Sequence, residues 1–208
     1  MEAIGSILSF IATYFAAKEN VLTWPLSVIA MAIYILIFVK VKLYADVLLH
    51  IIYLGMYVYG LVEWLKKADG KQTFHPRYMR FRNFFLIMSV GVLIALLSMP
   101  VAVYFNDSMP YLDTIATVFA LISTWMTAKK YIETWIVWWG LDVLYIYMYV
   151  SKGLYMTSLL HVTYLCLAIF GLYKWHRAYK FAKLAASAES DSDTINFNNH
   201  IVMETIDE

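Results

Sequence analysis

The chain has 208 residues, of which 62% are apolar, 17% aromatic and only 15% charged, and its formal net charge is +1. An average soluble domain is about 45–50% apolar and about 25% charged, and a compact domain of this size could not bury so much apolar surface. The composition therefore excludes an ordinary soluble enzyme and a disordered chain, and it predicts an integral membrane protein in a lipid bilayer. We expect no nucleic acid among its partners, because no basic face of a soluble fold is visible.

Seven apolar segments follow one another along the chain. They cover roughly residues 3–17, 24–39, 43–64, 84–105, 114–128, 132–150 and 154–175. Inside a bilayer the backbone must satisfy its own hydrogen bonds, so long apolar segments are predicted to be helices. A transmembrane barrel would need alternating segments of about 10 residues, which the sequence lacks. Glu2, with no Lys or Arg before the first segment, argues against a cleaved signal peptide and favours a first helix. The sequence thus predicts an all-α protein with seven transmembrane helices.

The loops between these segments differ strongly in charge. With the N-terminus on side A, thirteen of the sixteen Lys and Arg residues fall on side B and three on side A. The positive-inside rule then places side B in the cytoplasm, with the N-terminus outside and the C-terminus inside. We interpret residues 65–83 as a basic cytoplasmic loop and residues 176–208 as a cytoplasmic, disordered tail.

Residues 1–64 and 113–175 form an internal repeat with an offset of 111 residues. In this register 20 of the first 64 residues are identical to their partners, without a gap. The matches include Trp24 with Trp135, His50 with His161, Gly60 with Gly171, and Trp64 with Trp175. Each copy contains three predicted helices, and residues 84–112 add a linker helix and an outer loop, so the two copies run parallel. Parallel repeats of this kind occur in transporters, which bind substrate between the repeats near the membrane midplane. A duplicated scaffold without transport function is the alternative.

The sixth predicted helix presents an acid among aromatic rings. Trp135, Trp138, Asp142, Tyr145 and Tyr149 follow at spacings of three and four residues, which places them on one helix face. A carboxylate deep in hydrocarbon is costly, so Asp142 should face the bundle interior or a wet cavity. Indole rings beside a carboxylate favour a bound organic cation. A hydrogen-bonded structural acid is the alternative.

Two histidines occupy equivalent places in the third and seventh predicted helices. His50 is followed by Tyr53, and His161 by Tyr164, three residues later in each case. A histidine inside a membrane helix usually faces inward, where it could bond a substrate or connect helices. We expect no metal, because neither helix offers a second ligand four residues away. An intramembrane enzyme that uses His50, His161 and Asp142 is a further alternative.

Several other sequence features narrow the class of protein. No mid-span lysine in the last helix is available for a retinal Schiff base, and no GxSxG, HExxH or P-loop pattern occurs. Trp64 and Trp175, at predicted helix ends, are expected in the aromatic belts at the membrane surface. We therefore expect neither a cofactor nor an enzyme.

The repeats resemble the PnuC family of bacterial vitamin transporters. The resemblance lies in the runs LYADVLLHIIYLGMYVYG, AKKYIETWIVWWGLDV and KGLYMTSLL, with the closing GLYKW. It implies a parallel 3+1+3 arrangement of helices similar to a doubled SWEET-type unit, in the bacterial inner membrane. It further implies facilitated diffusion of a B-vitamin without ion coupling, trapping of the vitamin by a separate cytoplasmic kinase, and association into homotrimers.

The resemblance also bears on the substrate. In the nicotinamide riboside branch, helix six resembles Trp-x-x-Trp-x-x-x-Asn, whereas this chain has Asp142 at the last position and His50 where that branch often has glutamine. Asparagines common in that branch are replaced at Ala30, Tyr57 and Phe170. Members with an aspartate at this place look like the thiamine-transporting PnuT branch. The sequence therefore favours thiamine, with nicotinamide riboside as the alternative and a sugar carrier as a third possibility.

These inferences define an expected substrate site. Trp135 and Trp138 should sandwich the ring of the vitamin, and Asp142 should face its positive charge. The other expected lining residues are His50, Tyr53, His161 and Tyr164, and the candidates for gates at the two ends are Tyr34, Tyr145 and Tyr149.

Overall fold

The computed structural model describes residues 2–66, 75–104 and 109–206, which fold into seven α-helices. The helices are α1 (Glu2–Ala17), α2 (Thr23–Lys40), α3 (Tyr44–Leu65), α4 (Phe81–Tyr104), α5 (Pro110–Ala128), α6 (Thr134–Ser151) and α7 (Tyr155–Ile206). Their bounds lie within a few residues of the predicted apolar segments, except at the end of α7. The prediction of an all-α fold is confirmed.

Five of the described helices, α2, α3, α4, α5 and α7, are long and apolar enough to cross a membrane. Helix α1 is apolar but shorter. Helix α6 has 18 residues, but its Trp and Tyr side chains and Asp142 lower its mean hydropathy. The two less apolar helices therefore need neighbours that shield them from lipid, and each packs against two other helices.

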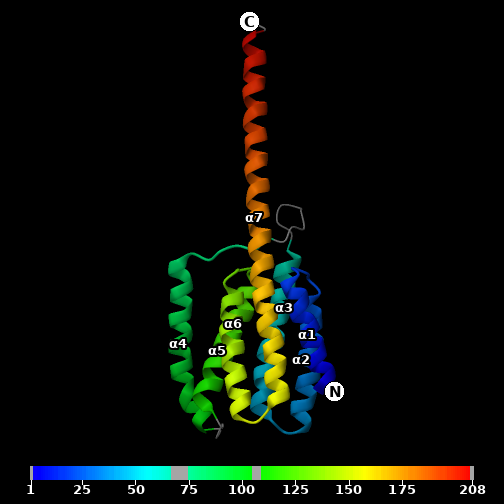
Figure 1. The fold of residues 1–208 in the computed structure, drawn as a ribbon, viewed down its shortest axis with the longest axis vertical. Helices are drawn as coiled ribbons and strands as arrows, with labels where there is room; N and C mark the ends of the chain where they lie inside the picture. The colour runs from blue at the N-terminus through cyan, green and yellow to red at the C-terminus, as the bar shows by residue number, and fades with distance from the viewer. Residues whose placement is uncertain (1, 67–74, 105–108, 207–208) are drawn as a thin grey trace.

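The helices form two groups with α4 to one side (Figure 1). Helices α1, α2 and α3, here called the N-terminal triplet, pack on one another, and α5, α6 and α7, the C-terminal triplet, are likewise joined through α6. Contacts of α1 with α7 and of α3 with α5 hold the triplets together. Among the described helices α4 packs against α5 alone, and Figure 1 shows it at the edge of the bundle.

The backbone follows the 111-residue register of the sequence. Helix α2 spans 23–40 and α6 spans 134–151, so both ends are separated by 111 residues. The positive φ angles also come in pairs, with 61° at Glu19 and 62° at Lys130, and 63° at Lys42 and 72° at Gly153. A left-handed residue costs about 1–2 kcal/mol unless it is glycine. The same helix-ending turns therefore occur in both triplets, although only one of the four positions is a glycine.

Helix α7 is longer than the sequence analysis predicts. It continues as a helix through Ile206, where we expected a disordered tail from residue 176, and Figure 1 shows it extending far beyond the other helices. After Gly171 the chain contains neither Gly nor Pro, and residues 178–188 are rich in Ala, Lys and Leu. These residues favour helix, and nothing in the sequence stops the helix that the membrane segment has begun.

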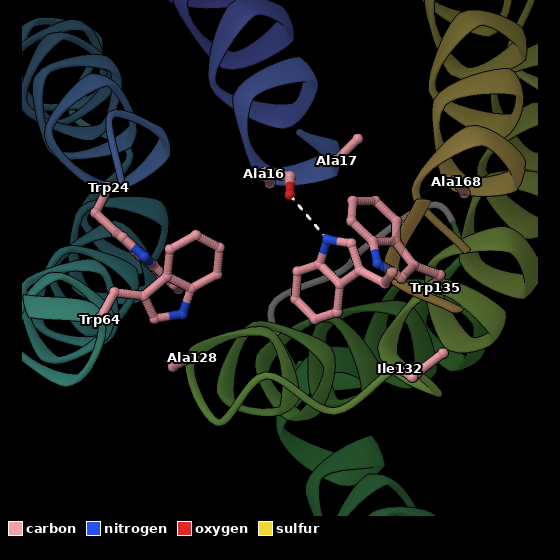
Figure 2. Packing of buried hydrophobic residues seen from close by; sticks show 9 residues of the cluster. Ala16, Ala17, Trp24, Trp64, Ala128, Ile132, Trp135 and Ala168 are labelled. Atoms are coloured by element: carbon pink, nitrogen blue, oxygen red, sulfur yellow. Dashed lines mark hydrogen bonds between the residues drawn. The ribbon is translucent and has the colours of Figure 1, made fainter. Parts of the chain in front are cut away.

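Four tryptophans form the centre of the largest buried cluster. This tryptophan layer consists of Trp24 and Trp64 from the N-terminal triplet and Trp135 and Trp175 from the C-terminal triplet (Figure 2). The ring centroids are 5.4 Å apart in each pair, edge to face, and 6.1 Å apart between Trp64 and Trp175. Trp64 is 7% exposed and Trp175 is 0% exposed, so the prediction of surface belts for these two residues is wrong.

The two equivalent glycines make room for these rings. A Cβ atom at Gly60 would lie 2.2 Å from the indole of Trp24, and a Cβ atom at Gly171 would lie 2.6 Å from that of Trp135. A buried indole cannot move away within a packed cluster, so any larger residue would push the helices apart. The identical Trp and Gly positions of the repeat therefore describe one packing unit that is used twice.

Candidate functional site

A cavity of about 220 Å³ lies between the two triplets. It is lined by residues of six helices, namely Thr13, Ala16, Thr23, Trp24, Ser27, Tyr57, Thr124, Thr127, Trp135, Trp138, Asp142, Tyr145, His161, Tyr164 and Ala168. Six of these were expected from the sequence, and four of the six come from α6. The cavity therefore lies at the interface of the repeats, where the repeat argument expects a site.

Helix α6 supplies the polar wall of the cavity. Trp135, Trp138, Asp142 and Tyr145 share one helix face because they follow at spacings of three and four residues. Asp142 lies seven residues beyond Trp135, which corresponds to about 10 Å along the helix axis. Its exposed fraction is 5%, so the carboxylate is shielded from bulk solvent by the bundle.

His161 of α7 pairs with this carboxylate. Its Nδ1 lies 2.9 Å from Oδ1 of Asp142, which is a hydrogen bond and, when the imidazole is protonated, an ion pair. The imidazole ring stacks on Tyr149 at 5.3 Å between centroids and packs against Tyr145 at 4.7 Å. Two aromatic neighbours and one acid thus fix the orientation of the imidazole.

A row of hydroxyl groups forms another part of the lining, and the sequence analysis missed it. Thr13, Ser27, Thr124 and Thr127 each donate their O–H to the backbone carbonyl four residues earlier, at 2.8 to 2.9 Å. Because the proton is used within the helix, each oxygen keeps acceptor capacity for a group in the cavity. The identity of Thr13 and Thr124 in the repeat register is the signal that could have identified this row.

The tryptophan layer borders the cavity at the end where α2 and α6 begin. Trp64 Nε1 donates a hydrogen bond to the carbonyl of Thr127, at 3.2 Å, and Trp175 Nε1 donates one to the carbonyl of Ala16, at 3.1 Å (dashed in Figure 2). The donors and the acceptors are both related by 111 residues, and each bond crosses from one triplet to the other. The triplets are therefore tied together symmetrically at this end of the cavity.

Four residues expected at the site lie outside the described lining of the cavity. His50 Nδ1 donates a hydrogen bond to the carbonyl of Asp46, at 2.8 Å, and its ring packs against Phe38. The Tyr34 hydroxyl is 3.0 Å from that of Ser6. Tyr53 stacks on the ring of Tyr57, which does line the cavity.

Tyr149 is the fourth of these residues. It stacks on Tyr145 and on His161, so it backs the acid–histidine pair without reaching the cavity. Within the described residues no group of three or more His, Cys, Asp and Glu side chains could hold a metal ion. The chemistry of the cavity is therefore that of one acid, one imidazole, indoles, phenols and hydroxyls.

Charged groups also gather at the ends of the helices, outside the membrane-spanning segments. Burial raises the pKa of Glu19 to about 7, against an opposing effect of Lys174. Burial also raises the pKa of Glu133, whose carboxylate accepts a hydrogen bond from the backbone N–H of Met79 at 3.0 Å. The Glu63 carboxylate raises the pKa of Lys129, 2.8 Å away.

Comparisons with known proteins agree with this architecture. A family described as "Nicotinamide mononucleotide transporter" matches residues 1–177. The nicotinamide riboside transporter PnuC of Escherichia coli (strain K12) is 19% identical over 202 residues, which cover 84% of each chain. PnuC of Neisseria mucosa is 18% identical over 192 residues, which cover 86% of this chain and 73% of the relative. A crystal structure of the vitamin B3 transporter PnuC has the same fold, with a TM-score of 0.71, 19% identity, and coverage of 86% of this chain and 81% of that chain.

Proposed function

Because the chain belongs to the nicotinamide mononucleotide transporter family, and is therefore a multi-pass membrane transporter and not an enzyme, we propose that it carries nicotinamide riboside across the bacterial inner membrane. The sequence analysis preferred thiamine, but the relatives are nicotinamide riboside transporters and give thiamine no support. The alternative that the sequence left open is thus the better one. The buried carboxylate of Asp142 in an aromatic cavity is the observation that carries the proposal.

The cavity offers a partner for each part of such a substrate. The pyridinium ring of nicotinamide riboside is flat and positively charged, so it suits the indoles of Trp135 and Trp138 and the carboxylate of Asp142. Its ribose hydroxyls can donate to the free lone pairs of the hydroxyl row. The sequence argument against a ribose rested on missing amide side chains, and it did not consider that Ser and Thr oxygens could replace them.

We further propose the 3+1+3 arrangement that the repeat predicts, similar to a doubled SWEET-type unit, with α4 as the linker helix. The two triplets rock about the cavity, and the tryptophan layer opens when side B becomes accessible. Transport is facilitated diffusion, and a separate cytoplasmic kinase traps the vitamin. The apolar surface of α4 that no described helix covers is available to lipid and to the neighbouring copies of a homotrimer.

The orientation of the carrier follows from the distribution of charge. Thirteen of the sixteen Lys and Arg residues are assigned to side B, the side to which α1, α3, α5 and α7 run. The positive-inside rule places that side, and the C-terminus, in the cytoplasm and the N-terminus outside. Accessibility labelling of single cysteines placed in the loops of a Cys166→Ser variant, in intact cells, tests this assignment.

The decisive experiment measures binding and uptake for three vitamins side by side. Purified protein is titrated with nicotinamide riboside, thiamine and riboflavin, and the same protein in vesicles is assayed for uptake of each. We expect binding of nicotinamide riboside and equilibration without accumulation above the external concentration. Preferential binding of thiamine would restore the substrate preferred by the sequence analysis, and accumulation without a kinase would contradict facilitated diffusion.

A further inference from the structure

The acid–histidine pair determines the charge of the cavity before substrate binds. Asp142 is 5% exposed, and its carboxylate contacts Nδ1 of His161. An ionised carboxylate without a counter-charge is costly inside a membrane protein. The pair therefore holds one proton in the substrate-free carrier, either as carboxylate and imidazolium or as carboxylic acid and imidazole. In both forms the pair has no net charge.

We propose that His161 is a specificity-determining residue that makes the carrier exchange one proton for each cationic substrate it binds. This inference rests on the proposed function, because it assumes a cation beside Asp142. When the pyridinium ring arrives, its charge neutralises the carboxylate, and the proton held by the pair leaves to water through the cavity. The imidazole becomes neutral and keeps its Nδ1–H bond to Asp142, since the proton departs from Nε2.

The exchange keeps the site electrically neutral at both stages. The substrate-free pair carries one proton and no net charge, and the loaded site contains a carboxylate, a neutral imidazole and one cation. Without the exchange, binding would add a net positive charge to a shielded cavity, which is unfavourable. A neutral ligand of the same shape displaces no proton, so the pair favours cations most where it can lose its proton most easily.

The surroundings of the pair contain little else that could take up or release this proton. The neighbouring titratable groups are Tyr145 and Tyr149 of α6, Tyr164 of α7, Tyr57 of α3, Tyr34 of α2 and Asp113 of α5. Tyrosines keep their protons at neutral pH, and Asp113 is paired with Lys152 at 3.2 Å. From α1 the cavity is lined by Thr13 and Ala16, which do not titrate.

The other triplet shows that the histidine alone does not create this device. The residue equivalent to Asp142 is Met31, and His50, the equivalent of His161, bonds the backbone carbonyl of Asp46 instead of an acid. A backbone carbonyl does not ionise, so His50 has no shared proton to exchange. The acid–histidine pair therefore belongs to the C-terminal triplet only within the described residues.

Calorimetry of the full chain in lipid nanodiscs tests the proposal. Nicotinamide riboside is titrated in two buffers with different ionisation enthalpies, at several pH values, which gives the number of protons released per ligand. Its uncharged reduced form, dihydronicotinamide riboside, is the matched ligand control. The variants are His161→Gln and, as a control on the same helix but outside the cavity, His176→Gln.

We expect close to one proton released per nicotinamide riboside at acidic pH, a dissociation constant that rises about tenfold for each unit by which pH falls below the titration range, and no proton released by the reduced form. His176→Gln should behave like the wild type, and His161→Gln should bind with no proton release and no pH dependence. Equal proton release by both ligands would overturn the proposal with the wild-type protein alone, and so would undiminished release in His161→Gln. If no heat of binding appears for nicotinamide riboside in either buffer, the proposed function itself fails.

Discussion

The two triplets have the same backbone but present different side chains to the cavity. Where the C-terminal triplet has Trp138, Asp142 and Ala168, the N-terminal triplet has Ser27, Met31 and Tyr57. A bulky residue on one side thus faces a small one on the other, and the cavity extends into the C-terminal triplet as far as His161 and Tyr164. Duplication supplied a symmetric scaffold, and a few substitutions on one side turned the interface into an asymmetric site.

The two histidines show how little change this required. Both lie in the same place of a triplet, and both pack against aromatic rings at 4.7 Å, His50 on Phe38 and His161 on Tyr145. Only His161 finds a carboxylate across the helix interface. One acid, at the position of Met31 in the other triplet, therefore separates a structural histidine from a candidate substrate-site histidine.

The largest expected effect comes from removing this acid. Asp142→Asn should weaken the binding of a cationic vitamin by on the order of 2–5 kcal/mol, because an amide cannot neutralise a desolvated charge. Met31→Leu, at the equivalent place outside the cavity lining, should leave the affinity within about twofold, since Leu and Met are of similar volume. Titration calorimetry of both variants measures the difference. Equal affinity of Asp142→Asn and the wild type would favour an uncharged substrate such as a sugar.

The glycines of the tryptophan layer test what the triplets share. Gly60→Ala and Gly171→Ala should each lower the free energy of unfolding by about 1–3 kcal/mol, because the added Cβ overlaps a buried indole. Gly55→Ala and Gly140→Ala are matched controls, since nothing lies within 4 Å of a Cβ at either position. Both controls should be neutral or stabilising by about 0.5–1 kcal/mol from helix propensity. Thermal unfolding in detergent measures all four, and a wild-type melting temperature for Gly60→Ala would show that the layer yields.

The two cross-triplet hydrogen bonds should contribute less. Trp64→Phe and Trp175→Phe each remove one indole donor, which costs about 0.5–1.5 kcal/mol for the hydrogen bond alone. The effect should be larger for Trp175, which is 0% exposed, than for Trp64, at 7%, because the smaller ring leaves an unfilled space. Thermal unfolding of the single and double variants measures both. A larger loss for Trp64→Phe would contradict this ranking.

The smallest expected effect concerns the left-handed turns between the first two helices of each triplet. Glu19 in one turn has a pKa raised by burial to about 7, whereas the equivalent residue in the other turn is Lys130. A pKa raised on folding means that the folded state holds the proton more tightly, so stability is present at low pH and is lost as pH rises through about 7. Melting temperatures from about pH 5 to 8 should fall for the wild type and stay flatter for Glu19→Gln.

The matched control for this turn is Lys130→Gln. Burial lowers the pKa of Lys130 from its ordinary value, and a lysine titrates well above neutrality, so this variant should keep the wild-type slope between about pH 5 and 8. A flattened slope in Lys130→Gln, or an unchanged one in Glu19→Gln, would assign the pH dependence to another group.

The site could be predicted from the sequence only in part. The spacing on α6 identified Trp135, Trp138, Asp142 and Tyr145, because helical periodicity is a local property. The hydroxyl row was missed, since Ser and Thr occur throughout membrane helices and do not differ by sequence when they face a cavity. Trp64 and Trp175 were assigned to the membrane surface because a tryptophan at a helix end is typical of that place; the sequence does not show that the other triplet buries them.

The sequence alone determined the seven apolar helices, the 111-residue register, the paired Trp and Gly positions and the acid on α6. These depend on backbone hydrogen bonding and hydrophobic periodicity, which act within one helix. Only the tertiary structure decided that Asp142 meets His161, that each triplet holds a tryptophan of the other, and that the cavity extends into one triplet. Such contacts depend on how helices from distant parts of the chain pack side by side, and they therefore depend on side-chain volumes in three dimensions and not on any local pattern.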